Sequence, residues 1–399
     1  MAKRSLRSLA VQSRRVLVRA DFNVPLDVRG RITDDFRIRA TLPTIRWLME
    51  HGARVVLISH LGRPKDREPE LSLAPVRSRL EELLGMPLRL LPDCVGPDIE
   101  AAVKRLTAGE VVLLENLRYH PGEGAETRDQ EPDFADRLAA LGDAYVNDAF
   151  GACHRADTSI VELPRRLPAA MGLLLEREIR AMEAILTAPK RPLVVVLGGG
   201  KVEDKIGVVL HLLPIADRVL IGGGAAFTFL KAIGYEIGRS RLDPKQLEAC
   251  REALARSPEK IVLPTDVLVA PDVASPAGSR VVPVDRMPPD WVGVDIGPET
   301  TRRFIEILRG AATVAWNGPM GIFEVREFAQ GTKAIARVLR ERSGQDATVV
   351  VGGGDTVAAV QQFGFAEGMD HLSTGGGAML EYLEGKELPG IAALPEAEG

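Results

Sequence analysis

The chain has 399 residues, which at roughly 150 residues per domain predicts two or three domains. Its 45% hydrophobic and 27% charged residues are typical of a soluble globular protein, and no apolar run reaches the ~20 residues of a membrane-spanning helix. A formal net charge of −4 argues against nucleic-acid binding through bulk charge. The N-terminal stretch lacks the apolar core of a secretory signal, and the three cysteines show no metal-ligand spacing. We therefore expect a cytoplasmic protein.

Short runs of Val, Leu and Ile alternate with amphipathic stretches along most of the chain. The runs predict strands at 15–22, 53–60, 110–116, 144–150, 192–199, 217–223, 260–264, 312–318 and 347–353. After the first strand, apolar side chains recur at helical spacing from Ile38 to Met49, with Thr33 as the expected cap and Gly52 as the expected end. Strands without polar alternation are typical of sheets covered on both faces. The pattern predicts an α/β fold of doubly wound, parallel, Rossmann-like sheets.

A charged amphipathic stretch at 173–188 divides this pattern into two halves. It predicts a helix that ends before Pro189 and that serves as a connecting rod between two domains. We expect an N-terminal domain over 1–172 and a C-terminal domain over 189–385.

Glycine triplets occur only in the second half, at 198–200, 222–224, 352–354 and 375–377. A single triplet is more often a tight turn. Several triplets at equivalent strand-to-helix corners favour an anion site, because the following helix points its free N–H groups at the ligand. Neither GxxxxGK[ST] nor GxGxxG is present, so a nucleotide would be bound by a different arrangement.

Two charged residues next to these corners have a second interpretation. Asp355 suits the first turn of a helix, but beside a phosphate it would also hold Mg²⁺. Lys201 would lie near the N-terminus of the following helix, where the helix dipole disfavours a positive charge unless an anion binds nearby.

The first half instead places charged side chains after its strands. They are Arg19, Asp21, Asn23, His60, Arg63, Arg118, His154 and Arg155, with Arg37 in the first turn of the following helix. Each arginine alone is more often merely solvated. Guanidinium groups that gather at one sheet edge repel one another, and a multiply charged anion would offset that repulsion.

Motifs along the whole chain occur in one familiar order. They are RADFNVPL, ITDDFRIRATLPTI, SHLGRP, ENLRYHPGE, LGGGKVEDKI, LPTDVLVA, AWNGPMGIFE, VVGGGDT and STGGGAMLEYLEGKELPG. Together they resemble the phosphoglycerate kinase family. This resemblance implies a monomer whose last segment, 386–399, returns to the N-terminal domain.

The resemblance also implies the roles of individual residues. It assigns to 3-phosphoglycerate or 1,3-bisphosphoglycerate the side chains of Asp21, Asn23, Arg37, His60, Arg63, Arg118 and Arg155. It assigns to ADP or ATP the residues Lys201, Lys205, Gly293, Asn317, Glu324, Gly353, Gly354, Asp355 and Thr356. Asp355 would hold Mg²⁺, and Arg37 with Lys201 would be catalytic.

The chain departs from the family pattern at a few positions. Gly200 and Ala152 stand where alanine and threonine are usual, Cys153 where alanine is usual, Asp157 where histidine is common, and Met379 where serine is frequent. None of these departures removes an expected ligand, although Ala152 and Cys153 put the packing around Arg155 in question.

Three functions are compatible with such a chain. The first is reversible phosphoryl transfer from 1,3-bisphosphoglycerate to MgADP after hinge closure of the two domains. A dinucleotide-dependent dehydrogenase is the second, against which the missing GxGxxG argues. A non-catalytic metabolite sensor is the third, but a sensor has no need of Arg37, Lys201 and Asp355 together.

Overall fold

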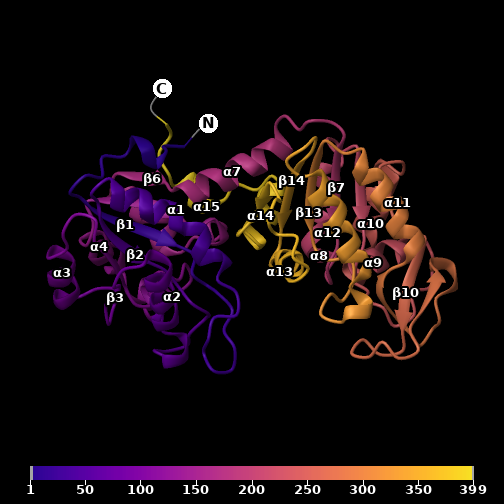
Figure 1. Ribbon diagram of the computed structural model, residues 1–399, viewed down its shortest axis with the longest axis horizontal. Helices are drawn as coiled ribbons and strands as arrows, with labels where there is room; N and C mark the ends of the chain where they lie inside the picture. Colours follow the sequence, from indigo (N-terminus) through magenta and orange to yellow (C-terminus); the bar gives the residue numbers. More distant parts are fainter. Residues whose placement is uncertain (1–2, 398–399) are drawn as a thin grey trace. The chain divides into compact units, whose positions relative to one another are not determined.

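The computed structural model describes residues 3–397, which form two compact units (Figure 1). The first unit comprises the described residues up to Ile179 together with those from Glu387 onward, and the second runs from Arg180 to Lys386. The C-terminal segment therefore belongs with the N-terminal half, where the backbone N–H of Arg4 donates to the carbonyl of Pro395 over 2.9 Å.

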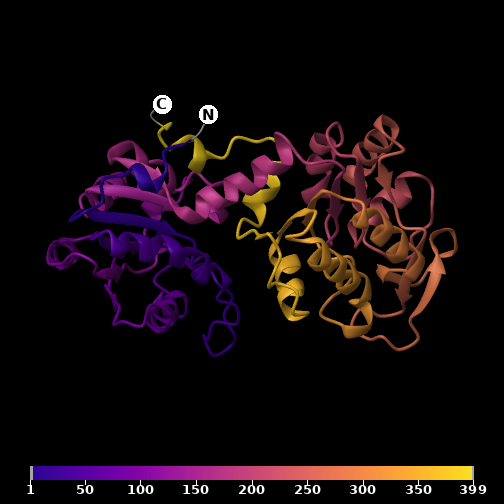
Figure 2. The ribbon, with the colours of Figure 1, turned by 45° about the horizontal axis from the view of Figure 1, so that its top comes forward.

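The first unit is built on a six-stranded parallel sheet in the order β3-β4-β2-β1-β5-β6. Its strands are β1 (Arg15–Ala20), β2 (Arg54–Ile58), β3 (Arg89–Leu90), β4 (Val111–Leu113), β5 (Ala144–Asp148) and β6 (Ala169–Met171). Its helices are α1 (Phe36–Glu50), α2 (Ala74–Leu84), α3 (Pro97–Lys104), α4 (Phe134–Ala139), α5 (Thr158–Val161), α6 (Leu163–Arg166) and α15 (Pro389–Ala392). The central strands are almost wholly buried, and helices lie on both sides of the sheet (Figure 2).

The second unit repeats this plan with the strand order β15-β14-β13-β7-β8-β9. Its parallel strands are β7 (Leu193–Leu197), β8 (Arg218–Ile221), β9 (Ile261–Val262), β13 (Thr313–Asn317), β14 (Thr348–Gly352) and β15 (His371–Leu372). Its helices are α8 (Glu203–Leu212), α9 (Ala225–Ala232), α10 (Leu247–Arg256), α11 (Pro298–Arg309), α12 (Gln330–Arg342), α13 (Gly354–Gln362) and α14 (Gly377–Leu383). The prediction of an α/β protein with two parallel, doubly wound sheets is confirmed.

A third, antiparallel sheet was not predicted. It joins β11 (Arg280–Pro283), β10 (Asp266–Ala270) and β12 (Val292–Ile296) within the second unit. These strands are short, and each contains or adjoins a charged residue or a proline, so they lack the unbroken apolar runs of the parallel strands. The sheet packs Val267 and Val269 against Phe227 of α9 in a separate apolar cluster.

Helix α7 (Leu173–Leu186) begins in the first unit and ends in the second, since the division falls after Ile179. Its start is fixed by a carboxylate at the end of β5. The Oδ1 atom of Asp148 accepts the backbone N–H groups of Leu174 and Leu175 over 2.9 and 3.2 Å. This interaction caps two of the free donors of the first helical turn.

The expected cap of α1 was wrong. The helix starts at Phe36 after Asp35, and the hydroxyl of Thr33 donates to the carbonyl of Pro25 over 3.3 Å instead. The expected end holds, because Gly52 follows the C-cap residue with a positive φ of 69°.

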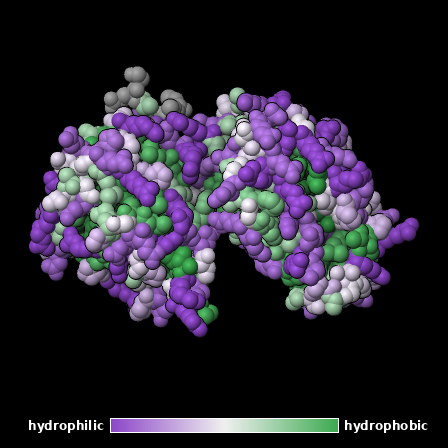
Figure 3. Space-filling view, in the orientation of Figure 1, coloured by the Kyte–Doolittle hydropathy of each residue, from purple (hydrophilic) through white to green (hydrophobic). Residues whose placement is uncertain are grey.

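On the face shown in Figure 3, each unit carries mainly hydrophilic residues with smaller hydrophobic patches between them. Within residues 3–397, no helix combines the length and the apolar character needed to cross a membrane.

Candidate active site

Four parallel strands of the first unit end at one edge of its sheet and bring most of the expected substrate ligands there. Asp21 follows β1, His60 follows β2, and Arg118 and Arg155 follow β4 and β5. Hydrogen bonds tie the loops at this edge to one another. The side chain of Asn23 accepts the N–H of Gly62 over 2.9 Å, and Arg118 donates to the carbonyl of Gly62 over 2.7 Å.

Arg37 lies in the first turn of α1 and is held by an acid from the neighbouring loop. Its Nη1 atom donates to Oδ2 of Asp21 over 2.7 Å. Burial alone would raise the pKa of Asp21, but the charge of Arg37 and of nearby basic groups lowers it to about 2. The Asp21 carboxylate therefore stays ionised and orients the guanidinium of Arg37, whose side chain is 28% exposed.

His60 is held in one tautomer by a buried arginine. The Nη2 atom of Arg19 lies 3.1 Å from Nδ1 of His60. Arginine only donates, so Nδ1 must be the accepting nitrogen and Nε2 must carry the hydrogen. Burial, reinforced by the charge of Arg19, lowers the pKa of His60 well below its usual value. His60 is thus a neutral side chain with one N–H to offer.

Arg19 itself is fully buried, and sequence reasoning gave it no separate role. Its Nε donates to Ser159 over 2.7 Å, and Glu123 lies 3.7 Å away. Burial raises the pKa of Glu123, while its two oxygens accept the N–H and hydroxyl of Ser159 over 2.9 and 2.6 Å. Through Arg19, this network holds the ring of His60 in place.

The remaining arginines differ in how far they are partnered. Arg118 lies 3.4 Å from the carboxylate of Asp157, and burial lowers its pKa. Among the described residues, the guanidinium groups of Arg63 and Arg155 make no hydrogen bond or ion pair, and Arg63 is exposed. The guanidinium groups of Arg63 and Arg155 are therefore available to bind an anion at this edge.

The second unit contains a cavity of about 400 Å³ beside the glycine corners that follow β7 and β8. Its apolar wall comes mainly from α9 and the antiparallel sheet, through Phe227, Val267, Val292 and Val294. Gly293, Glu324 and Asp355, three of the expected nucleotide ligands, also line it. Gly293 must be glycine here, because a Cβ would lie 1.9 Å from the ring of Phe227.

A second group of expected nucleotide ligands gathers where β13 and β14 end. The Nζ atom of Lys205 donates to Oδ1 of Asn317 over 2.5 Å, and burial lowers the pKa of this lysine. Thr356 accepts the N–H of Gly318 over 2.7 Å. The buried Nδ2 of Asn317 has no hydrogen-bond partner within the described part of the chain. An unsatisfied buried donor at this corner calls for an acceptor from a ligand.

The corner is completed by the start of α13. Gly353 has a φ of 92° and packs closely on Asn317, since a Cβ would lie 3.1 Å from its amide nitrogen. The helix then begins at Gly354, which leaves its first N–H groups free for an anion. Asp355 is exposed in the same turn and offers one carboxylate, which fits the usual magnesium arrangement of one or two carboxylates plus phosphate oxygens.

Lys201 stands apart from these contacts. It is exposed, and its Nζ atom lies 3.5 Å from the carboxylate of Glu203 at the start of α8. Such an exposed pair is weak, so the lysine is free to reach a ligand.

Comparisons with known proteins identify the family. The model of the phosphoglycerate kinase family matches residues 6–386. The chain belongs to the phosphoglycerate kinase family. It is 53% identical over 397 residues to the phosphoglycerate kinase of Thermomicrobium roseum, covering 98% of this chain and 99% of the relative. It is 51% identical over 400 residues to that of Moorella thermoacetica, covering 99% and 100%.

Solved phosphoglycerate kinases share the fold. The structure from Pyrococcus horikoshii matches with a TM-score of 0.87 and 33% identity, covering 99% of this chain and 98% of that one. The structure from Coxiella burnetii matches with a TM-score of 0.84 and 38% identity, covering 98% of both chains. These findings favour a phosphoglycerate kinase over a dinucleotide-dependent dehydrogenase.

The departures from the phosphoglycerate kinase pattern are accommodated locally. Ala152 and Cys153 are buried, and Ala152 belongs to a small apolar cluster with Ile160, so the packing near Arg155 is intact. Met379 fills the space beside Gly352, where a Cβ would lie 1.8 Å from its sulfur.

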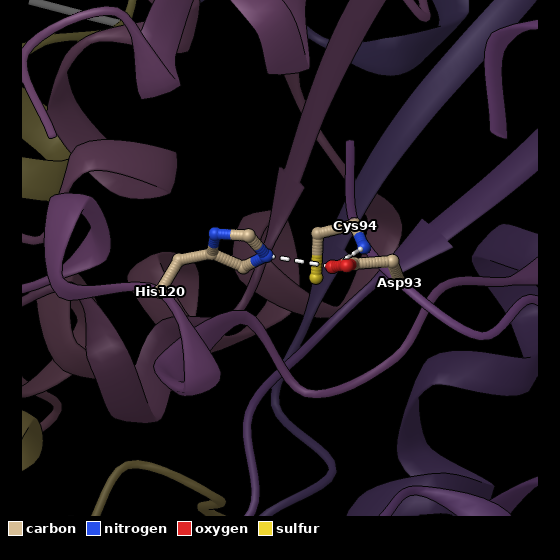
Figure 4. Close-up of side chains that lie close together, drawn as sticks. All are labelled: Asp93, Cys94 and His120. Atoms are coloured by element: carbon tan, nitrogen blue, oxygen red, sulfur yellow. Dashed lines mark hydrogen bonds and ion pairs between the residues drawn. The ribbon is translucent and has the colours of Figure 1, made fainter. Parts of the chain in front are cut away.

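One polar cluster lies outside the expected ligands. Asp93, Cys94 and His120 have potential metal-ligand atoms within 4.8 Å of one another (Figure 4). The spacing of the cysteines in the sequence did not predict this cluster. Nε2 of His120 lies 2.6 Å from Asp93, whose carboxylate also pairs with Arg67. The thiol of Cys94 donates to the carbonyl of Glu115 over 2.9 Å, and burial raises its pKa. Asp93, Cys94 and His120 thus each have a hydrogen-bond or ion-pair partner in the protein.

Proposed function

We propose that this chain catalyses the reversible transfer of a phosphoryl group from 1,3-bisphosphoglycerate to MgADP, giving 3-phosphoglycerate and MgATP, a step of glycolysis. Membership in the phosphoglycerate kinase family carries this proposal. The geometry supports it, because the first unit offers side-chain cations and the second offers glycine corners beside an apolar cavity.

The substrate would bind at the edge of the first unit. Arg63 and Arg155, whose guanidinium groups have no partner among residues 3–397, would bind phosphate and carboxylate oxygens, and Arg37 would present a charge held in place by Asp21. His60 would donate from Nε2, and Asn23 and Arg118 would close the site through their contacts with Gly62.

The nucleotide would bind in the second unit. Its base would enter the cavity beside Gly293, with the ribose at Glu324. Its phosphates would lie at the start of α13, against Asn317 and Thr356, with Lys201 and Lys205 as counter-charges. Mg²⁺ held by Asp355 and the phosphates would neutralise part of the phosphate charge.

In the forward direction, an oxygen of the terminal ADP phosphate would attack the phosphorus of the acyl phosphate. The bond between that phosphorus and the carboxyl oxygen would break, and 3-phosphoglycerate would leave as a carboxylate. The acyl phosphate is already activated, so no protein nucleophile is required. Alignment and charge stabilisation remain, and we assign these to Arg37 and Lys201.

The two binding sites belong to different units, so transfer requires that the units close on each other. We assign the phosphoglycerate domain to 1–172 with 386–399, the nucleotide domain to 189–385, and the hinge to the ends of helix 173–188. Closure would also exclude water, which would otherwise hydrolyse the acyl phosphate. We further propose a cytoplasmic monomer.

The test is ATP formation from 1,3-bisphosphoglycerate, MgADP and the purified chain, followed by a hexokinase-coupled assay. We expect turnover that requires both substrates and Mg²⁺, and that disappears when a metal chelator is added. A folded protein that binds 3-phosphoglycerate and ADP but forms no ATP would contradict the proposal and would favour a sensor.

A further inference from the structure

Arg241 is an unpaired cation in the cavity of the second unit. It follows Ser240 in the loop before α10 and is the one lysine or arginine among the described residues that line the cavity. Its guanidinium makes no hydrogen bond or ion pair within residues 3–397. The lining also includes three acids, Asp295, Glu324 and Asp355, but none of them forms a direct bond with Arg241.

The guanidinium of Arg241 lies next to Gly200. A Cβ at Gly200 would lie 3.1 Å from Nη1 of Arg241, which is closer than ordinary van der Waals contact. Gly200 therefore leaves the guanidinium of Arg241 the space that a side chain would partly occupy.

The backbone next to Arg241 belongs to the end of the cavity that would take the base. The hydroxyl of Ser240 accepts the N–H of Gly293 over 2.9 Å. Gly293 in turn lies directly against the ring of Phe227. The phosphate corner is formed by other residues, of which Asp355 alone reaches the cavity wall.

We propose that Arg241 lies against the purine ring of the bound nucleotide and contributes to affinity through the base rather than through the phosphates. A planar guanidinium stacks readily on an aromatic face, and because Arg241 is exposed, the attraction should be of the modest size found at solvent-accessible sites. This inference rests on the proposed function, because it concerns the nucleotide that the function requires.

The test compares adenosine with ADP as ligands of Arg241→Met, which keeps the length of the side chain and removes its charge. Calorimetric titration should show both ligands weakened by the same factor, about fivefold. Binding of tripolyphosphate should not change. The matched control is Arg251→Met, an exposed arginine on α10 that pairs with Glu248 over 3.0 Å, and both ligands should bind it normally.

A second variant tests the role of the missing Cβ. Gly200→Ala should weaken adenosine and ADP slightly in the native background, because the added Cβ makes the flexible end of Arg241 give way by a few tenths of an ångström. In the Arg241→Met background the same change should have little further effect.

Three outcomes would overturn the inference. Unchanged adenosine affinity in Arg241→Met would remove the base contact. A loss for ADP and tripolyphosphate but not for adenosine would assign the cation to the phosphates. A native protein that binds no nucleotide at all would contradict the proposed function as well, and this result is distinct from the other two.

Discussion

The two units have the same kind of parallel sheet, but the loops at the carboxyl ends of their strands differ in composition. In the first unit the loops after the strands carry charged side chains that are buttressed by acids and by one another, as in the 2.7 Å pair of Arg37 with Asp21. In the second unit the corresponding corners carry glycines, and Gly353 leads into a helix with free N–H groups.

This difference fits the ligands that we propose for the two units. A small, highly charged anion with little apolar surface is best held by several side-chain cations that can be placed around it. A nucleotide has a large apolar base and a phosphate chain, so a cavity next to a bare backbone corner suits it better. Glycines matter in the second unit because side chains would occupy the space of the ligand.

The largest effect should come from removing Arg37, the cation of the first unit to which we assign stabilisation of the transferring phosphoryl group. Arg37→Ala should lower kcat by about 10²–10³-fold with a modest change in KM, as for other fixed donors to a developing charge. The control is Arg39→Ala on the same helix, whose arginine pairs with Asp35. Near-normal turnover in Arg37→Ala would refute the assigned role.

Replacing Lys201 in the second unit should lower kcat by a comparable factor. Lys201→Ala should reduce kcat by about 10²-fold while ADP still binds, because the exposed lysine makes only a weak 3.5 Å pair in the free protein. Steady-state kinetics with both substrates varied will separate kcat from KM. If Lys201→Ala lost affinity alone and kept its kcat, the lysine would be a binding residue only.

The glycine corner can be tested without touching a charge. Gly353→Ala adds a Cβ 3.1 Å from the amide of Asn317, whereas Gly364→Ala places one at a similar positive φ with no atom within 4 Å. Both should lose stability, and Gly353→Ala should lose more, because its ψ of 130° lies outside the left-handed helical region that an alanine can adopt at a cost of about 1–2 kcal/mol. Gly353→Ala alone should also weaken ADP binding by about tenfold, because it disturbs a donor to the phosphates. Equal ADP affinity in both variants would remove this corner from the site.

The smallest effect on turnover is expected at Asp148, an acid of the first unit that serves structure. Burial raises the pKa of its carboxyl from 3.8 to about 7. The folded state then keeps a proton that the unfolded chain has lost, so this group makes stability fall as the pH rises through that window, by at most about 1.4 kcal/mol per pH unit.

Asp148→Asn keeps the oxygen that caps α7 and removes this titration. Urea unfolding followed by circular dichroism should show the variant gaining on the native protein from about pH 4 to pH 7, with no further gain above, while its kcat at pH 8 stays close to native. A constant difference at every pH would mean that Asp148 is not protonated in the folded state.

The fold was largely readable because parallel strands buried on both faces are unbroken apolar runs, as at Leu193–Leu197. The antiparallel strands escaped, since Asp266 and Asp295 interrupt their pattern. Local capping also failed at Thr33, whose hydroxyl found a carbonyl from an earlier loop.

At the candidate site, strand ends and glycine corners indicated which segments would gather at each sheet edge. The support behind them was not readable. Two of the partners that allow Arg19 to be buried, Ser159 and Glu123, lie far along the chain. Arg241 lies in a stretch without any sequence motif, so its position next to Gly200 could be recognised only from the structure.

The central claim is that the two edges act on one phosphoryl group and that the units close to let them. Single-molecule energy transfer tests this most directly, with dyes on Lys104→Cys in the first unit and Lys245→Cys in the second, since the three native cysteines are buried. We expect 3-phosphoglycerate and MgADP together to shift the population to a shorter distance more than either ligand alone. A distance that stays the same with both ligands bound would contradict the account.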